Sequence, residues 1–274
     1  MDAIVLHGGA SARPELNERV KKYAEQAFDM KNALDAVVEA VRLMEDDPLF
    51  NAGTGSNVRI DGSIQMDAAV MVPNDFGGVI NIEYVKNPIL VARDVLKKSP
   101  HLILAGAGAT EFARKMGYEE YNPITQRAVA KRDKTIEKLK KGEIPSYYHP
   151  EFFADFLGDT VGAVAYINGE FAAAVSTGGT SLTLHGRVGD SPIPGAGIYC
   201  GSNGAVVSTG IGEEIIRRMS AMSIYSKIGT SDLYAICDAE IEKYENIPVG
   251  FIAISKDEQC AKSNLMMPNA VLTR

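Results

Sequence analysis

Apolar residues follow two different spacings along the chain, and each spacing predicts a different kind of element. Between Leu34 and Met44 they recur every three or four positions, which predicts an amphipathic helix capped by Asn32. Residues 160–167 and 170–177 are largely apolar runs separated by Asn-Gly, which predicts two strands joined by a tight turn. Helices and strands are therefore both expected in this chain.

The remaining expected elements form groups instead of alternating strictly. Strands are expected at 3–7 and 204–210, hairpins around Asp61-Gly62 and across 250–263, and helices from Pro88, over 212–220 and over 231–244. Runs of antiparallel strands with helices grouped between them predict an α+β fold, not an alternating parallel sheet. We expect a single domain that spans residues 1–274.

The stretch from Gln126 to Gly158 differs from the rest of the chain. It is rich in lysine, contains two prolines and has little apolar periodicity after Leu139. Its charged half is compatible with a solvated helix, and an exposed linker is expected over about 131–158. A long exposed linker in the middle of a compact protein requires a functional reason.

The acidic balance of the chain excludes two classes of partner. The net charge is −7 and the pI is near 5.2, whereas nucleic acids and anionic membrane surfaces are bound by basic faces. No stretch approaches the ~18 consecutive apolar residues of a membrane span, and no basic segment followed by a long apolar run opens the chain. We expect a cytoplasmic protein that binds neither nucleic acid nor a membrane.

Cysteine and histidine are too few and too scattered for metal or disulfide chemistry. The 3 cysteines form no CxxC pair, and the 4 histidines form no HxxxH pair. A disulfide framework, a zinc site and a catalytic metal or cofactor are therefore not expected.

Threonine beside glycine recurs in the second half of the chain, at 176–180 and at 208–210, and Thr160 opens the first strand after the linker. Each instance alone is typical of a strand threonine beside a bulge or turn. A threonine hydroxyl is a weak nucleophile, and no His–Asp pair is evident to activate it. A cut before Thr160 would supply an α-amino group with a pKa of roughly 8 as the base. The combination indicates a self-cleaving hydrolase whose nucleophile is Thr160.

Eight segments carry a resemblance to a known family and come in that family's order: LHGGA (6–10), EDDPLFNAGTGS (45–56), MDAAVM (66–71), VKNPILVAR (85–93), DTVGAVA (159–165), AVSTGG (174–179), HGRVGDSPIPGAG (185–197) and STGIGE (208–213). Through them, residues 1–98 and 158–220 resemble the plant-type L-asparaginases, or isoaspartyl peptidases, which are N-terminal nucleophile hydrolases. The resemblance implies a four-layer αββα sandwich that cleaves itself between Asp159 and Thr160. The products would be an α-subunit of residues 1–159 and a β-subunit of residues 160–274, assembled as a dimer of such αβ units.

The resemblance also implies an activity, the release of L-aspartate from L-asparagine and from β-aspartyl (isoaspartyl) peptides through an acyl-enzyme on Thr160. Thr177 corresponds to the threonine that hydrogen-bonds the nucleophile. Thr209 and Gly210 correspond to the oxyanion hole, in which a hydroxyl and a backbone N–H meet the charge that develops during attack.

The substrate-binding residues follow from the same resemblance. Arg187 and Asp190 correspond to a clamp for the free α-carboxylate and α-ammonium of the aspartyl group, which require opposite charges. A surface Arg–Asp pair is the other interpretation of these two residues. Gly212 would offer its carbonyl to the ammonium, and Asn51 would approach the nucleophile and order the site.

A sodium ion is a further implication of the resemblance, although no cofactor is expected for catalysis. The ion would be held by the backbone carbonyls of Met44, Glu45, Asp47, Phe50, Ala52 and Thr54. Carbonyl oxygens suit a hard cation, but acidic side chains that solvate a helix end would produce the same sequence pattern.

Departures from the family pattern, among them those at Ser11 and Asp159, and three alternatives accompany this interpretation. Ser11 stands where the family usually has glycine, and Asp159 stands before the nucleophile where glycine is commoner. Asp159 is shared with glycosylasparaginases and taspase, so an N4-(β-N-acetylglucosaminyl)-L-asparaginase is the nearest alternative and a taspase-like endopeptidase a weaker one. A nucleotide-binding module, suggested by GAGA at 106–109, is more remote because the pattern lacks a full GxGxxG.

Overall fold

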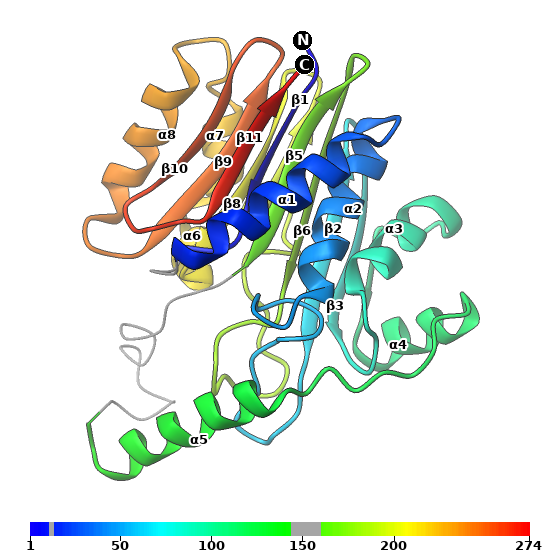
Figure 1. Ribbon diagram of the computed structural model, residues 1–274, viewed down its shortest axis with the longest axis vertical. Helices are drawn as coiled ribbons and strands as arrows, with labels where there is room; N and C mark the ends of the chain where they lie inside the picture. Colours follow the sequence, from blue (N-terminus) through cyan, green and yellow to red (C-terminus); the bar gives the residue numbers. More distant parts are fainter. Residues whose placement is uncertain (11–13, 144–159) are drawn as a thin grey trace.

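The computed structural model describes residues 1–10, 14–143 and 160–274 of the chain. Its larger sheet has seven strands in the order β11-β1-β5-β6-β2-β3-β4 (Figure 1). All neighbours are antiparallel except β3 and β4. The strand bounds are β1 Ala3–His7, β2 Met66–Val72, β3 Asp75–Ile82, β4 Ile103–Ala105, β5 Val161–Ile167, β6 Glu170–Thr177 and β11 Asn269–Thr273.

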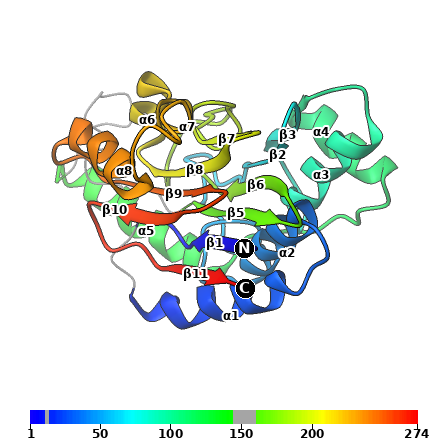
Figure 2. The same ribbon diagram turned by 90° about the horizontal axis from the view of Figure 1, so that it is seen from above.

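The smaller sheet has four antiparallel strands in the order β10-β9-β8-β7. Their bounds are β7 Ile198–Gly201, β8 Gly204–Gly210, β9 Val249–Ser255 and β10 Gln259–Ser263. The two sheets lie face to face, as the view from above shows (Figure 2). Val5 and Val164 of one sheet and Val207 and Ile252 of the other belong to one buried cluster between them. The α+β class predicted from the sequence is confirmed.

Helices cover the outer face of each sheet. On the larger sheet lie α1 (Asn17–Phe28), α2 (Ala33–Asp46) and α3 (Pro88–Lys98), and on the smaller sheet lie α7 (Ser220–Tyr225) and α8 (Leu233–Ile241) (Figure 2). The other helices are α4 (Gly106–Lys115), α5 (Gln126–Lys140), α6 (Gly212–Arg218) and the short 3-10 turns Pro14–Leu16 and Glu242–Tyr244.

Helix α2 shows why the pattern of apolar positions was sufficient to predict it. Val37, Val41 and Met44 are completely buried against the larger sheet. The side chain of Asn32 accepts a hydrogen bond from the backbone N–H of Asp35 at 2.8 Å, so the predicted cap is confirmed.

The two glycine turns predicted from Asn-Gly and Asp-Gly pairs have different outcomes. Asn168 (φ 53°) and Gly169 (φ 83°) join β5 to β6 as expected. Asp61-Gly62 does form a turn, but residues 57–65 contain no strand, so the predicted hairpin is wrong. The N–H of Arg59 donates to the carbonyl of Ser63 across the turn at 2.9 Å, but the N–H of Ile60 donates to the carbonyl of Thr183 at 3.1 Å, so the pairing does not continue into two strands.

The predicted linker is only partly described. Residues 126–140 form helix α5, whose single buried residue is Ala128, in agreement with a solvated helix. Residues 144–159 lie outside the described residues, as does Ser11. Among the helices of the described ranges, none combines the length and the apolar character needed to cross a membrane.

Strand register brings the threonine-rich segments to one end of the two sheets. Val161 of β5 pairs with Ser176 of β6, so Thr160 and Thr177 follow as neighbours at that end. Thr209 and Gly210 close β8 of the facing sheet, whose strand contacts both β5 and β6. Three strand ends from two sheets therefore converge on one place.

Candidate active site

Thr160 lies at the start of β5, only 5% exposed, and it lines a small pocket between the strand ends. The pocket brings together six of the predicted site residues. It is lined by Thr160, Thr177, Gly179, Thr180, Arg187, Gly189, Asp190, Ser191, Gly210 and Gly212. Thr209 and Asn51 do not line the pocket but contact the segments that do.

The turn after Thr177 is fixed by its own hydroxyl, because Oγ1 of Thr177 accepts a hydrogen bond from the N–H of Gly179 at 3.0 Å. Two glycines are required in this turn. A Cβ on Gly178 would lie 2.4 Å from Cβ of Ser56, and Gly179 has a φ of 71°. The motif STGG therefore has a steric reason in this fold, and it holds Thr177 beside Thr160.

Gly210 shows a second close approach on the same side. Its φ is 149°, and a Cβ there would lie 2.4 Å from the carbonyl oxygen of Pro248. The neighbouring Thr209 is completely buried, and its Oγ1 accepts a hydrogen bond from the N–H of Ala10 at 3.3 Å. Of the two residues assigned to the oxyanion hole, Gly210 thus lines the pocket, and Thr209 is tied to the loop that follows β1.

Arg187 is held by a carboxylate that the sequence did not single out. Its Nε and Nη2 donate to the two carboxylate oxygens of Glu213 at 2.9 and 2.8 Å, and its side chain is only 13% exposed. Burial disfavours the charged form, but the pair with Glu213 keeps the pKa of Arg187 above its ordinary value. The same pair keeps the pKa of Glu213 low despite burial. Both groups are therefore ionised at neutral pH.

Asp190 lies against the same guanidinium. Its side chain is buried, and within the described ranges its Oδ2 has no hydrogen-bond partner. Burial raises the pKa of Asp190 to about 7, against the opposing influence of Arg187. At Gly212 a Cβ would lie 2.9 Å from Nη2 of Arg187 and 3.0 Å from Oδ1 of Asp190. Only glycine allows both charged groups to approach the start of α6 so closely.

Two buried charges lie behind the pocket and were missed at the sequence level. Arg59 is completely buried and donates from Nη2 to the carbonyl of Arg187 at 2.9 Å and from Nη1 to Thr183. Asp67 on β2, opposite Thr177, accepts from the N–H of Asn81 at 2.7 Å. Burial lowers the pKa of Arg59 to about 10 and raises that of Asp67 to about 6. The only sequence signal was an aspartate inside the otherwise apolar MDAAVM.

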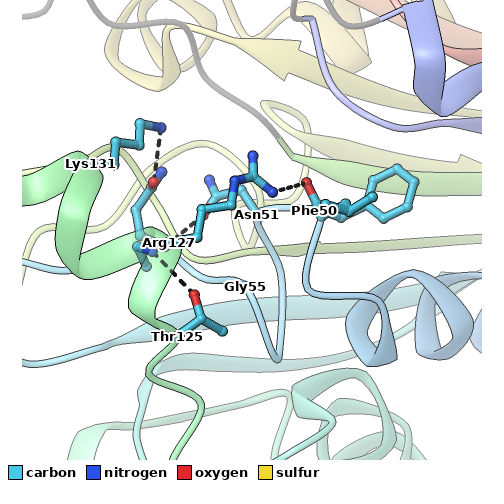
Figure 3. A pocket seen from close by; sticks show the side chains of 9 residues that line it. Phe50, Asn51, Gly55, Thr125, Arg127 and Lys131 are labelled. Carbon is cyan, nitrogen blue, oxygen red and sulfur yellow. Dashed lines mark hydrogen bonds between the residues drawn. The ribbon is translucent and has the colours of Figure 1, made fainter.

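Asn51 contacts the turn after Thr177, which lines the pocket. Its Nδ2 donates to the carbonyl of Gly179 at 2.7 Å, its Oδ1 accepts from the N–H of Asn57 at 2.8 Å, and its carbonyl accepts from the N–H of Gly178 at 2.9 Å. Figure 3 shows Asn51 beside Arg127 and Lys131 of helix α5. Asn51 therefore orders the turn after Thr177, and its side chain is directed toward that turn.

Comparison with known proteins identifies the family of this chain. The asparaginase family model matches residues 2–268. The chain belongs to the asparaginase family. It is 44% identical to a plant-type L-asparaginase of Pyrococcus horikoshii, over 79% of this chain and 76% of that protein. It is 36% identical to an isoaspartyl peptidase of Escherichia coli, over 94% and 88%. It is 37% identical to an N(4)-(β-N-acetylglucosaminyl)-L-asparaginase of Elizabethkingia miricola, over 82% and 68%.

His7 lies buried beside the start of β5 in this asparaginase. It is completely buried, and its Nδ1 accepts from the N–H of Gly9 at 3.2 Å. Burial lowers the pKa of His7 to about 3, so the ring is neutral near pH 7. At Gly162, its partner on β5, a Cβ would lie 2.5 Å from Nε2 of His7. The imidazole fills the space that this glycine leaves.

The loop expected to hold sodium in the asparaginase is tightly folded. The carbonyl of Glu45 accepts from the N–H of Thr54 at 2.8 Å, and that of Asp47 accepts from the N–H of Phe50 at 3.1 Å. A carbonyl has two lone pairs, so these bonds leave room for a cation. The side chains of Glu45 and Asp47 are engaged elsewhere. Across the described residues, no group of three or more His, Cys, Asp or Glu side chains could hold a metal ion.

Proposed function

We propose that this asparaginase is a self-processing threonine amidohydrolase that releases L-aspartate from L-asparagine and from β-aspartyl peptides. The observation that carries the proposal is the pocket in which Thr160 faces the oppositely charged pair Arg187 and Asp190. The pair suits a zwitterionic aspartyl group, and the hydroxyl supplies a nucleophile near its side-chain amide. Relatives named plant-type L-asparaginase and isoaspartyl peptidase support the proposal.

In turnover, Arg187 binds the α-carboxylate of the substrate, and Asp190 with the carbonyl of Gly212 binds the α-ammonium. The α-amino group of Thr160 takes the proton of its own hydroxyl while Oγ1 attacks the side-chain carbonyl carbon. Negative charge develops on the carbonyl oxygen and is met by the hydroxyl of Thr209 and the N–H of Gly210. The proton then passes to the leaving amine, the C–N bond breaks, and water hydrolyses the resulting ester on Thr160 to release L-aspartate.

The free α-amino group requires a cut before Thr160, which we propose the chain makes itself. Oγ1 of Thr160 attacks the carbonyl of the preceding Asp159 in an N→O acyl shift, and water hydrolyses the ester. The products are chains 1–159 and 160–274, the second having 274 − 159 = 115 residues. Asp159 lies outside the described residues. The two facing sheets with helices on both outer faces support a four-layer αββα arrangement of the N-terminal nucleophile type (Figure 2).

The oligomeric state and a bound sodium ion are further proposals. We propose a dimer of cleaved αβ units and a structural sodium ion at the carbonyls of the 44–54 loop. The folded loop and its partly used carbonyls are compatible with that ion, and no catalytic step depends on it.

Denaturing electrophoresis with mass spectrometry tests the cut, since the wild type should give two fragments of 159 and 115 residues. The Thr160→Ala protein should remain one intact, inactive chain. Kinetics with L-asparagine, β-aspartyl-leucine and N4-glycosylated asparagine test the substrate class. We expect turnover of the first two substrates. Exclusive turnover of the third would favour the glycosylasparaginase alternative, and full activity of an uncut chain would overturn the mechanism.

A further inference from the structure

Helix α5 rests on the 48–60 loop mainly through basic side chains on one face. Arg127 donates from Nη1 to the carbonyls of Pro48 and Leu49 at 3.3 and 3.1 Å. Five residues later, Arg132 donates to the carbonyls of Arg59 and Ile60 at 3.3 and 2.9 Å. Only Ala128 of this helix is buried. These hydrogen bonds place the helix together with Ala128 and Val129, which pack on the apolar core. Figure 3 shows Arg127 and Lys131 beside the loop that carries Asn51.

Lys131 makes the contact that leads toward the pocket. Its Nζ donates to Oδ1 of Asn57 at 2.9 Å, and Nδ2 of Asn57 donates to the carbonyl of Gly179 at 2.8 Å. An ammonium group has only donors, so it fixes the amide of Asn57 with the oxygen toward α5 and the NH₂ toward Gly179. The carbonyl of Gly179 thus receives two amide donors, since Nδ2 of Asn51 lies 2.7 Å from the same oxygen.

Gly179 transmits this contact to the reacting groups. It lines the pocket with Thr160, and its N–H donates to Oγ1 of Thr177 at 3.0 Å. We propose that Lys131 is a positioning residue, which acts through Asn57 on Gly179 and thereby on the hydroxyl of Thr177. The inference rests on the proposed function, since it assigns Lys131 a role in the turnover proposed for Thr160.

The arrangement has a consequence for the cut chain. Pro48, Leu49, Asn57, Arg59 and Ile60 all belong to the proposed α-subunit, whereas Gly179 belongs to the β-subunit. The bond from Asn57 to Gly179 therefore crosses between the two subunits. Helix α5 precedes the cleavage site and must stay docked on the 48–60 loop after the cut, because it orients the amide that makes this bond.

A set of variants of the full-length, matured protein tests the role of Lys131. We expect Lys131→Met to lower kcat about five- to tenfold and to leave KM within about twofold, because Thr177 is displaced while the clamp is untouched. Lys131→Arg, which retains a donor-only side chain, should recover most of the loss. Lys134→Met, at an exposed lysine of the same helix, is the matched control and should behave like the wild type.

A double-mutant cycle separates positioning from general destabilisation. If Lys131 acts through Asn57, the effect of Lys131→Met should vanish in an Asn57→Ala background. Unchanged kcat in Lys131→Met, or a full additional loss in the Asn57→Ala background, would overturn the proposal. Self-cleavage is followed on the same preparations by electrophoresis, so that a processing defect is recognised.

A crystal structure of the cleaved wild type gives a readout that does not depend on activity. We expect α5 on the 48–60 loop and Asn57 between Lys131 and Gly179. A detached helix or a differently directed amide would overturn the inference even in an active enzyme. Conversely, a wild type that turns over no β-aspartyl substrate would remove the proposed function, and the crystallographic result would then still decide whether the contact exists.

Discussion

On one side of the pocket, Thr160, Thr177 and Gly210 present uncharged hydroxyls and backbone, whereas on the other lie the charged groups of Arg187 and Asp190, with Glu213 paired to Arg187. The side that carries the proposed nucleophile Thr160, called the nucleophile side below, is positioned by close backbone approaches that exclude a Cβ, as at Gly210. The side that carries the proposed substrate clamp, called the clamp side below, is positioned by the ion pair of Arg187 with Glu213 and contains the buried carboxyl of Asp190, whose charge depends on pH. The difference predicts that steric changes will affect kcat on the first side, while charge changes will affect KM on the second.

The largest expected effect is on the nucleophile side, from Gly210→Ala. A Cβ at that position would lie 2.4 Å from the carbonyl of Pro248, so the strand end must shift and the N–H assigned to the oxyanion must move with it. We expect kcat to fall about 10²–10³-fold, as for loss of an oxyanion donor. Gly62→Ala is the control, because Gly62 has a φ of 93° but open space around it. Comparable kcat losses in both variants would contradict the steric explanation.

On the clamp side, Glu213→Ala should act mainly on KM. Without the bonds at 2.9 and 2.8 Å, the guanidinium of Arg187 loses the partner that fixes its orientation, and we expect KM to rise about tenfold while kcat changes about twofold or less. Glu213→Gln, which keeps one acceptor, should be intermediate. The neighbouring Glu214 pairs instead with Arg217 and Arg218 at the surface, so Glu214→Ala serves as the control. A loss of kcat without a change in KM would contradict the assignment of Glu213 to the clamp side.

The pH dependence of KM also distinguishes the charged clamp side from the uncharged nucleophile side. Because burial raises the pKa of Asp190 to about 7, the free enzyme carries a growing fraction of protonated Asp190 as the pH falls below that value. A neutral carboxyl does not hold the substrate ammonium, so KM should rise by up to about tenfold per unit below pH 7. In Asp190→Asn, KM should be high at every pH and lack this rise. The same rise in both proteins would assign the titration to another group.

Asp190→Asn should bind the substrate less tightly than the wild type but have a more stable fold. A carboxyl whose pKa is raised on folding destabilises the folded state as pH rises from its ordinary value toward about 7 and above, since the charged form is buried. Asp190→Asn should therefore be more stable than the wild type at pH 8 by a larger margin than at pH 4. Urea unfolding of matched preparations at both pH values measures this margin, and an equal difference at the two would contradict it.

The fold could be predicted where one physical rule decided the local structure. The apolar spacing over 34–44 and the turn at Asn168-Gly169 needed no tertiary information. Asp61-Gly62 carried an equal turn signal, yet its flanking residues make one bond across the turn, from the N–H of Arg59 to the carbonyl of Ser63, before the N–H of Ile60 donates to the distant carbonyl of Thr183. A sequence pattern does not contain that competing partner, so the hairpin prediction was wrong.

The site residues also divide into those that the sequence predicted and those that it did not. Thr160, Thr177 and Gly210 belong to short motifs, and the fold brings them to one pocket. Glu213 and Asp67 lie inside the quoted segments STGIGE and MDAAVM, and Arg59 lies outside all of them. The sequence pattern assigned none of the three a role, because a charge held by a partner from another element is recognised only when that partner is known. Cleavage before Thr160 remains a prediction, since residue 159 lies outside the described part of the chain.

The smallest expected effect concerns Glu45, whose side chain contacts Ser176 of β6 on the nucleophile side. Its Oε1 accepts from Oγ of Ser176 at 2.6 Å and from the N–H of Ile89 at 3.0 Å, and burial raises its pKa to about 8. The carboxyl is therefore mostly protonated at neutral pH, and a glutamine amide reproduces its shape and its acceptor. We expect Glu45→Gln to change the free energy of unfolding at pH 7 by less than about 1 kcal/mol. Glu45→Ala should cost about 2–3 kcal/mol, because it leaves two buried donors unpaired. A large loss of unfolding free energy in Glu45→Gln would mean that the ionised carboxylate is needed. A buried charge would then also stabilise the nucleophile side.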